Sequence, residues 1–390
     1  MVWQRRHSMG QVMQREWRYI CTHRWLMLCI VGVPLLGVLF FTTMLHAGLP
    51  ERIPIAIVDA DHSVASRKIV ADLSAQQSVD VVMKCNSYSE ARSAMQREDI
   101  YGFVLIPERM EQLAWDGKQP CISFYINDAF LIPGSLLYRS FKTMSLLASA
   151  SIVQDVLLSI DVSPGSIDAL LQPITIDLHP LGNPWVNYSV YLSNSFIPAL
   201  LQLIVLLTTI YTLGREWKHG TVSQWMDVSH GDATLAVVGK MIVYTLLYVS
   251  VGIISLGILY GVLRYPFHTP VLNMIAAMIL LIASAQSLAL VLFVLSPNLP
   301  VAFSAASVVG VVSFSLGGFS FPVADMYPSL RPLSYLLPVR HYFLIYVNNA
   351  LNGYPLYYCR GEYIALLVFV VVGMLFLPLL IRRINQCRTS

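Results

Sequence analysis

The chain has 390 residues, of which 56% are hydrophobic and only 12% are charged. A soluble protein carries about twice that charged fraction, so the composition excludes an ordinary soluble globular protein and indicates a surface covered largely by lipid. The net charge of +3 is small, and no basic patch is interleaved with aromatic residues, which argues against nucleic acid as a partner.

Residues 1–25 predict an amphipathic helix that lies on the cytoplasmic face of a membrane. Apolar residues recur there at helical spacing, and most of the arginines fall on the other side of the helix. The apolar positions are Met9, Val12, Met13, Trp17 and Ile20. The alternative is a polar, arginine-rich tail that only fixes the orientation of the chain.

Stretches that lack Asp, Glu, Lys and Arg predict six transmembrane helices. A bilayer core about 30 Å thick requires about 20 apolar residues in a helix. The longest stretch is divided by Pro297 and Pro300, because proline breaks a helix. The predicted spans are 26–45, 193–213, 241–263, 271–295, 301–321 and 363–381. We expect the first to be an uncleaved anchor and not a signal peptide, since no A-x-A site follows it.

Lys and Arg residues near the ends of these spans predict that both termini are cytoplasmic. They gather before the first span, in the loop 214–240 and in the tail 382–390. The region 322–362 then lies on the opposite side, and Pro322, Pro328, Pro332 and Pro338 predict broken helices that re-enter the membrane. His341 in this region is expected either to line an exit or to cap a re-entrant helix.

Residues 46–192 hold most of the acidic residues and predict an inserted α/β domain outside the membrane. Strands and helices alternate there, which is typical of such a domain. Strands are predicted at 53–58, 79–83, 101–106 and 121–126, and helices at 63–77, 87–97 and 134–160. The predicted fold class is therefore an α-helical polytopic membrane protein with six transmembrane helices and an inserted extracytoplasmic α/β domain.

Two groups of residues in this domain have both a chemical and a structural interpretation. Asp59, Asp61 and His62 could hold a metal, but a polar turn between a strand and a helix is the preferred interpretation. Cys85 and Cys121 are either a disulfide or two ordinary buried thiols, with the second preferred.

The sequence contains no motif of an autonomous pump or enzyme. It has no G-x-x-x-x-G-K-[ST] phosphate loop, no G-x-S-x-G and no H-E-x-x-H. None of the predicted spans contains an ionisable Asp, Glu, Lys or Arg, whereas ion-coupled transporters usually bury at least one. We therefore expect no catalytic residue, no metal and no cofactor, and we expect energy to arrive from outside the membrane.

The loop 214–240 resembles the coupling loop of the ABC-2-type permease family. It carries the R-E-x-x-x-G-T pattern from Arg215 to Thr221, and Gly239-Lys240 leads into the next span. Family members often have proline near Ser229-His230-Gly231, so the turn there is expected to differ. Further segments resemble the subgroup with a large exterior domain and the family's L-x-x-x-x-P-x-x-H-Y pattern: 59–63, 101–107 and 333–342.

This resemblance implies a multi-pass permease subunit of an ABC exporter in a bacterial inner membrane, without an ATPase site of its own. The implied partners are cytoplasmic ABC ATPase subunits, a second permease (identical or different), membrane lipid and, in this subgroup, often a periplasmic adaptor protein. The implied substrate is a drug-like or amphipathic compound. The alternatives are an ion-efflux permease of the same family and a non-transport receptor or secretion scaffold.

The resemblance also implies roles for individual residues. The residues implied to couple the permease to the ATPase are Arg215, Glu216, Gly220 and Thr221. Gly220 would allow a turn and Thr221 would cap the following helix, while Arg215 and Glu216 would pair with each other or with the ATPase. The alternative is that Arg215 and Glu216 are only charges that flank the end of a membrane span.

The candidates for the translocation path are Gln202, Thr208, Thr209, Ser284, Gln286 and Ser287. Hydrogen bonds between helices are the alternative role for these six residues.

Overall fold

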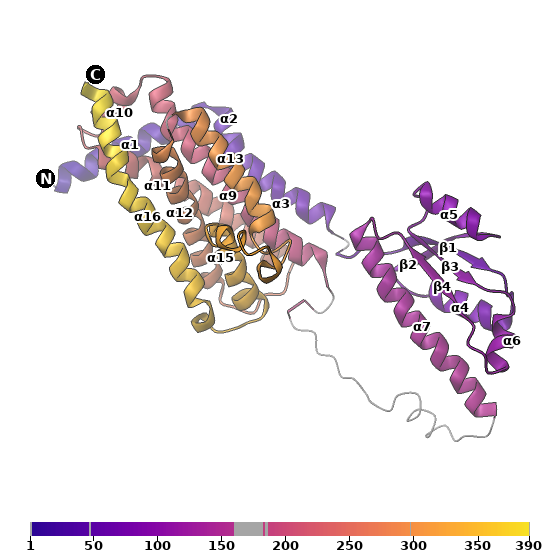
Figure 1. Ribbon diagram of the computed structural model, residues 1–390. Coiled ribbons are helices and arrows are strands. Elements are labelled where there is room, and N and C mark those ends of the chain that lie inside the picture. Colours follow the sequence, from indigo (N-terminus) through magenta and orange to yellow (C-terminus); the bar gives the residue numbers. More distant parts are fainter. Residues whose placement is uncertain (1, 47, 160–181, 184–185, 297, 390) are drawn as a thin grey trace. The chain divides into compact units, whose positions relative to one another are not determined.

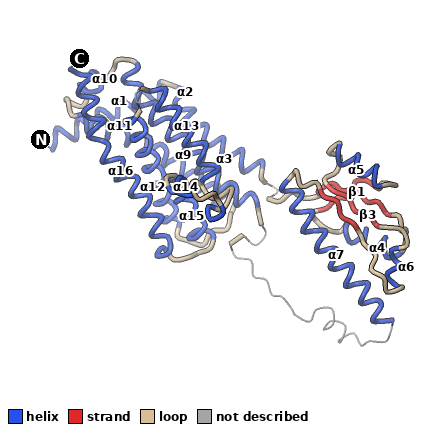
Figure 2. The backbone as a smooth tube through the Cα atoms, viewed as in Figure 1, coloured by secondary structure: helices blue, strands red, loops and turns tan. Residues whose placement is uncertain are grey.

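The computed structural model describes residues 2–46, 48–159, 182–183, 186–296 and 298–389 (Figure 1). The chain divides into two compact units. The larger unit comprises Met1–Gly48 and Pro180–Ser390, and the smaller one comprises Leu49–His179. Strands occur only in the smaller unit of the described chain (Figure 2).

The smaller unit is built on a four-stranded sheet in the order β2-β1-β3-β4. Its strands are β1 (Ile53–Asp59), β2 (Val79–Lys84), β3 (Gly102–Ile106) and β4 (Ser123–Ile126). β1 is parallel to both β2 and β3, whereas β4 is antiparallel to β3. The predicted strands are thus confirmed, and β3 and β4 begin one and two residues later than predicted.

Helices cover both faces of this sheet, which explains why strand β1 is apolar from Ile53 to Val58 and becomes polar only at its last residue, Asp59. Side chains of a strand alternate between its faces. Ile55 and Ile57 face a core formed with α4 (Val64–Ser74), α6 (Met110–Trp115) and α7 (Leu131–Ser159). Ala56 and Val58 face the other core, which includes residues of α5 (Tyr88–Gln96).

Local capping fixes where α4 and α5 begin. Ser63 Oγ accepts a hydrogen bond from Ser66 N at 3.0 Å, and Ser87 Oγ accepts one from Glu90 N at 3.3 Å, as predicted. The Glu90 carboxylate accepts from Asn86 N, one residue before the cap. Helix α4 ends at Ser74, three residues earlier than predicted, and residue 160 lies outside the described residues.

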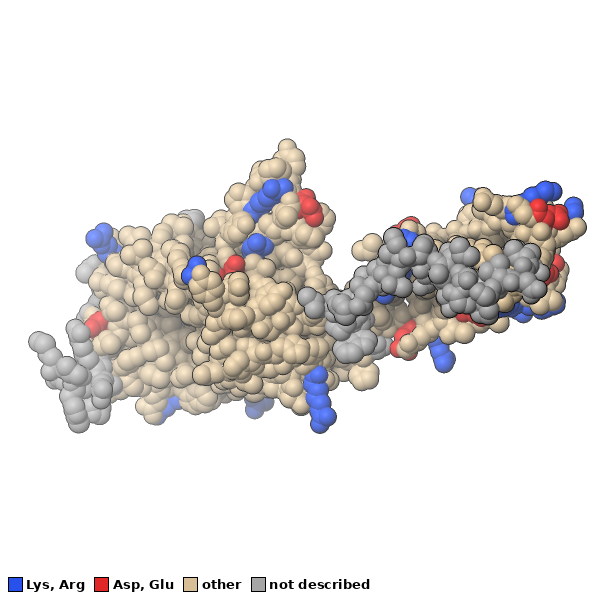
Figure 3. Space-filling model, turned by 90° about the horizontal axis from the view of Figure 1, so that it is seen from below, with Lys and Arg blue, Asp and Glu red and all other residues tan. Residues whose placement is uncertain are grey.

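The larger unit contains six described helices that are long and apolar enough to cross a membrane. The first span, Arg24–Met44, consists of α2 (Arg24–Met27), a π-helical turn and α3 (Val33–Met44). The others are α9 (Tyr188–Lys218), α11 (Ala233–Leu256, continued to Val262 by a π-helical turn), α12 (Val271–Leu295), α13 (Leu299–Leu316) and α16 (Leu356–Thr389). In Figure 3 this unit presents a broad surface with few charged side chains.

Three of these helices extend well past the predicted span ends, which had been placed at charged residues. α9 continues to Lys218, α11 begins at Ala233, and α16 begins at Leu356. The helices therefore include Glu216, Lys240 and Glu362, which lie just outside the predicted spans 193–213, 241–263 and 363–381. The helices extend further because backbone hydrogen bonding continues through a charged residue when its side chain finds partners. Whether the membrane-embedded part of each helix lacks ionisable residues stays a prediction.

Shorter helices complete this unit. α1 (Val2–Thr22) packs against α11, and α10 (Val222–Val228) lies between α9 and α11. The region 322–362 contains α14 (Arg331–Tyr335) and α15 (Pro338–Ile345), and α15 packs against α9, α12 and α16. This agrees with the broken helices predicted there, whereas their depth in a membrane stays a prediction.

Candidate functional site

The loop between α9 and α11 forms a turn followed by the short helix α10. Gly220 has φ +64°, a left-handed conformation that glycine adopts without strain, as predicted for this turn. One side of α10 is anchored, because Trp225 and Met226 are fully buried. The other side is exposed and carries Ser223, Gln224 and Asp227. Helix α10 thus presents a narrow polar surface, while its buried side chains hold it against the rest of the protein.

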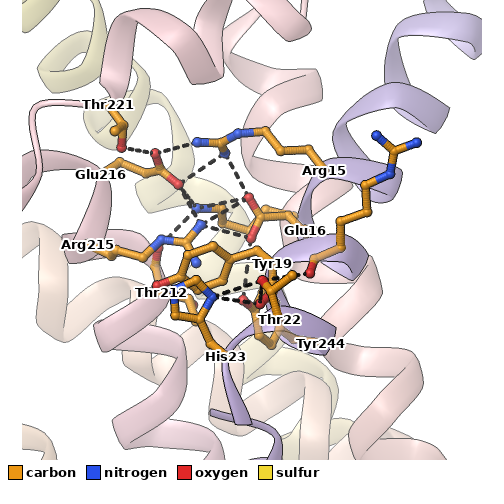
Figure 4. Close-up of polar contacts among 12 residues, drawn as sticks. Arg15, Glu16, Tyr19, Thr22, His23, Thr212, Arg215, Glu216, Thr221 and Tyr244 are labelled. Atoms are coloured by element: carbon orange, nitrogen blue, oxygen red, sulfur yellow. Dashed lines mark hydrogen bonds and ion pairs between the residues drawn. The ribbon is translucent and has the colours of Figure 1, made fainter. Parts of the chain in front are cut away.

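Five charged side chains from three helices meet beneath this loop (Figure 4). We call them the ion cluster. They are Arg15 and Glu16 of α1, Arg215 and Glu216 of α9, and Lys240 of α11. Four of them are buried, and only Arg15 is partly exposed, with 25% of its side chain accessible. Buried charges are tolerated only when each is paired and hydrogen-bonded.

Glu216 is at the centre of the ion cluster. Its carboxylate accepts hydrogen bonds from Lys240 Nζ at 2.6 Å, from Arg215 Nη2 at 2.8 Å and from Arg15 Nη2 at 2.9 Å. The Thr221 hydroxyl donates to Glu216 Oε2 at 2.5 Å. Thr221 therefore ties the start of α10 to the cluster through its side chain, instead of capping α10 as predicted.

Glu16 is the second carboxylate of the ion cluster and comes from the N-terminal helix. It contacts Arg15 at 2.9 Å, Arg215 at 3.2 Å and Lys240 at 3.4 Å. The Tyr244 hydroxyl donates to Glu16 Oε2 at 3.4 Å. Glu16 thereby joins α1 to both α9 and α11 through charge-assisted bonds, which are stronger than neutral ones.

Aromatic rings cover two of the three cations of the ion cluster. The Arg215 guanidinium lies 3.5 Å from the centroid of the Tyr19 ring, and Lys240 Nζ lies 4.3 Å from the centroid of a Trp225 ring. Cations over aromatic faces are stabilised by the ring quadrupole. Burial raises the pKa of the Tyr19 hydroxyl while Arg215 opposes that shift, so Tyr19 stays neutral at neutral pH. Lys240 also donates to the Thr212 carbonyl at 3.0 Å, near the end of α9.

The predicted coupling residues all lie in or next to this cluster. Arg215 and Glu216 pair with each other, which was one of the two expected arrangements. Both are buried, so they meet other groups of this chain and present little surface to a partner. Their role in coupling stays a prediction, and any such role has to act through the helices that they join.

Sequence reasoning missed Arg15, Glu16 and Lys240 as members of one site. A signal for Glu16 was present, since it is the only acidic residue before the first span. It stands four residues from both Val12 and Ile20, so it lies on the apolar face of α1. An acidic residue on that face indicates a buried cation as its partner.

The six residues predicted to line a translocation path are all buried within this chain. Gln202 Nε2 donates to Ser313 Oγ at 2.9 Å, and Gln202 Oε1 accepts from Val339 N at 2.7 Å. Thr208 bonds the Tyr248 hydroxyl, Ser284 donates to the Leu366 carbonyl, and Gln286 accepts from Thr245. Ser287 lies against Gly373, and the Thr209 hydroxyl has no hydrogen-bond partner among the described residues. Four of the six thus link helices, and a role in the path stays a prediction.

The structure also distinguishes between the chemical and the structural interpretations of the Asp59–His62 segment and of Cys85 and Cys121. Asp59 Oδ1 accepts from Asp61 N and His62 N, and Asp59 Oδ2 accepts from the Ser66 hydroxyl. These bonds are those of the predicted polar turn, and the described residues contain no group of three metal-binding side chains. Cys85 and Cys121 are both free thiols, but only Cys85 is buried; Cys121 is exposed, so the preferred prediction of two buried thiols is wrong for Cys121.

The fold defines an integral membrane protein, because six of the described helices are long and apolar enough to cross a membrane. Residues 24–378 match the family model described as ABC-2 family transporter protein. The chain therefore belongs to the ABC-2 family, the membrane permeases of ABC transporters, which lack an ATPase site and normally work with cytoplasmic ATPase subunits. No curated protein matches the chain.

Proposed function

We propose that this chain is the permease subunit of an ATP-driven exporter in a bacterial inner membrane. Both termini and the loop between α9 and α11 would be cytoplasmic, and the smaller unit would lie outside. Two permeases, identical or different, would form the path and bind ATPase subunits, with a periplasmic adaptor as a further partner. The exposed side of α10 would receive the ATPase.

The observation that carries this proposal is the connection between α10 and the ion cluster. Thr221 joins the start of α10 to Glu216, and Glu216 contacts cations of α1, α9 and α11. Separating such buried charges costs several kcal/mol, so the four helices are expected to move together. A push on α10 would then reach the first span through α1 and the second and third spans directly.

A groove along the membrane helices supports a drug-like or amphipathic substrate. It has a volume of about 860 Å³ and is lined by residues of the first span, α9 and α13. Most of its lining is apolar, with Arg24 and Tyr211 among the polar exceptions, and Thr208 of the predicted path also lines it. This size and character are typical of sites for drug-sized ligands.

The proposal is tested by changing the exposed side of α10 without disturbing the ion cluster. We expect Gln224→Arg or Asp227→Arg to lower co-purification of an ABC ATPase in mild detergent by at least about tenfold, a loss of about 1.4 kcal/mol of binding. Both side chains are exposed, so the permease should still fold and elute as the unchanged protein does. Glu108→Arg, an equivalent charge change on an exposed residue of the smaller unit, is the matched control.

The same variants test the substrate class in cells. Cells with either α10 variant should lose resistance to amphipathic drugs and keep their salt tolerance. A loss of salt tolerance alone would favour the ion-efflux alternative. Variants that retain both the ATPase and drug export would refute the role assigned to α10.

A further inference from the structure

The buried His341 and the partly exposed Glu362 form a close pair between α15 and α16. His341 belongs to α15 and is only 5% exposed, while Glu362 belongs to α16. His341 Nδ1 lies 2.6 Å from Glu362 Oε2, and His341 Nε2 lies 3.0 Å from the Tyr335 carbonyl oxygen. Both nitrogens of one imidazole therefore face oxygen atoms.

The chemistry of these partners determines how many protons the pair holds. A backbone carbonyl oxygen only accepts hydrogen bonds, so Nε2 carries a hydrogen. At 2.6 Å, Nδ1 and Oε2 also need one proton between them, on either the imidazole or the carboxyl group. The pair thus holds one proton more than a neutral histidine beside an ionised glutamate. We propose that His341 and Glu362 form a proton-binding site that fastens α15 to α16.

The charged groups near the pair have other partners, so the proton is shared only between His341 and Glu362. On α14 and α15, the Arg331 guanidinium donates to the Met326 carbonyl, and the Arg340 guanidinium lies 4.6 Å from the Tyr335 ring. On α16, Arg360 stacks on Tyr357, and Phe369 lies 6.0 Å from the His341 ring. The nearer parts of the packed elements also carry Tyr188 and Tyr191 of α9, Tyr342 of α15, and Tyr358, Cys359 and Tyr363 of α16. The charged residues Arg215, Glu216 and Lys218 are at the far end of α9, and Arg382 and Arg383 follow Glu362 by about 20 residues along α16. Helix α12 has no charged residue.

Loss of the proton would leave two lone pairs facing each other at the Nδ1–Oε2 contact. That arrangement is repulsive, so α15 would be held less firmly as the pH rises. The Glu362 side chain is 28% exposed, which gives water access to the site. Histidine side chains in general change charge near neutral pH, which determines the pH range chosen for the test.

Hydrogen exchange of the purified full-length protein in detergent tests the site. In the wild type, the protection of α15 amides, corrected for intrinsic exchange, should fall as the pH rises from about 6 to about 8.5, by up to about tenfold per unit for one linked proton. Glu362→Gln replaces the carboxylate with an amide that donates to Nδ1 at every pH. Its protection should change by less than about twofold over the same range.

Asp325→Asn is the matched control, since Asp325 is an exposed acid in the segment before α14. This variant should keep the wild-type slope. A Glu362→Gln protein with the wild-type slope would overturn the proposal. Protection of α15 that does not change with pH in the wild type would also overturn it, without the need for any variant to fold.

Discussion

Glu16 and Glu216 are buried carboxylates, and each contacts more than one cation of the ion cluster. Burying an ion pair often adds little stability compared with apolar residues, but removing one partner leaves an uncompensated charge. Replacing a single charged residue of this cluster should therefore lower the stability of the fold strongly. Glu16 is the most informative of them, because it is the one carboxylate that α1 contributes.

Glu16→Gln keeps the shape of the side chain and removes its charge. We expect the variant to lose about 3–5 kcal/mol of unfolding free energy, because Arg215 and Lys240 would stay buried with one carboxylate fewer. Chemical unfolding in detergent measures this loss. Arg18→Gln, which changes an exposed charge on the same helix, should cost less than about 1 kcal/mol. Equal effects of the two changes would contradict the assigned role of Glu16.

At the scale of helices, α16 packs closely against α12, and the absence of a side chain at Gly373 allows the two backbones to approach. A Cβ atom at Gly373 would lie 2.5 Å from Ser287 Cβ and 2.9 Å from Ser287 Cα, so the two backbones would have to separate. A Cβ atom at Gly361, on the same helix, would meet nothing within 4 Å. The two glycines therefore differ only in packing.

Alanine substitutions at these glycines should have opposite effects on stability. Gly361→Ala should raise the unfolding free energy by about 0.5–1 kcal/mol, because alanine favours the helix. Gly373→Ala should lower it by about 1–3 kcal/mol, because overpacking outweighs that preference. Thermal unfolding of the purified variants measures both changes. A stabilising Gly373→Ala would show that α12 and α16 are not in close contact.

At the scale of the whole molecule, native cysteines report which parts face which side of the membrane. Cys121 is exposed in the smaller unit, and Cys21 is exposed near the end of α1. Cys85 is buried, and burial, with a further contribution from the charge of Glu90, raises the pKa of its thiol. Since the thiolate is the reactive form, Cys85 should react slowly at neutral pH and faster only as the pH rises.

A membrane-impermeant maleimide should therefore label Cys121 in intact cells and Cys21 only after the membrane is permeabilised. Mass spectrometry of the labelled peptides distinguishes the sites, and slow labelling of Cys85 serves as the control for an intact fold. Labelling of Cys21 before Cys121 would reverse the proposed topology. It would also place α10 on the side away from any cytoplasmic ATPase.

Much of this protein follows from the sequence because the relevant forces act within contiguous segments. Long runs of apolar residues predicted the six candidate spans, and short apolar runs separated by helical segments predicted the strands β1 to β4. The caps at Ser63 and Ser87 and the turn at Gly220 depend on a few neighbouring residues, so they too were predicted. The family resemblance, carried by motifs in the same order along the chain, agrees with the family match.

Only the tertiary structure decided which charged groups meet. Glu16 and Arg215 are 199 residues apart in the sequence, and His341 and Glu362 belong to different helices, so no local pattern pairs them. Gln202, predicted to line the path, hydrogen-bonds residues of α13 and α15 and so links these helices to α9. Hydropathy determines that a segment enters lipid, but the partner of a buried polar group depends on which helices pack together, and that is a property of the whole fold.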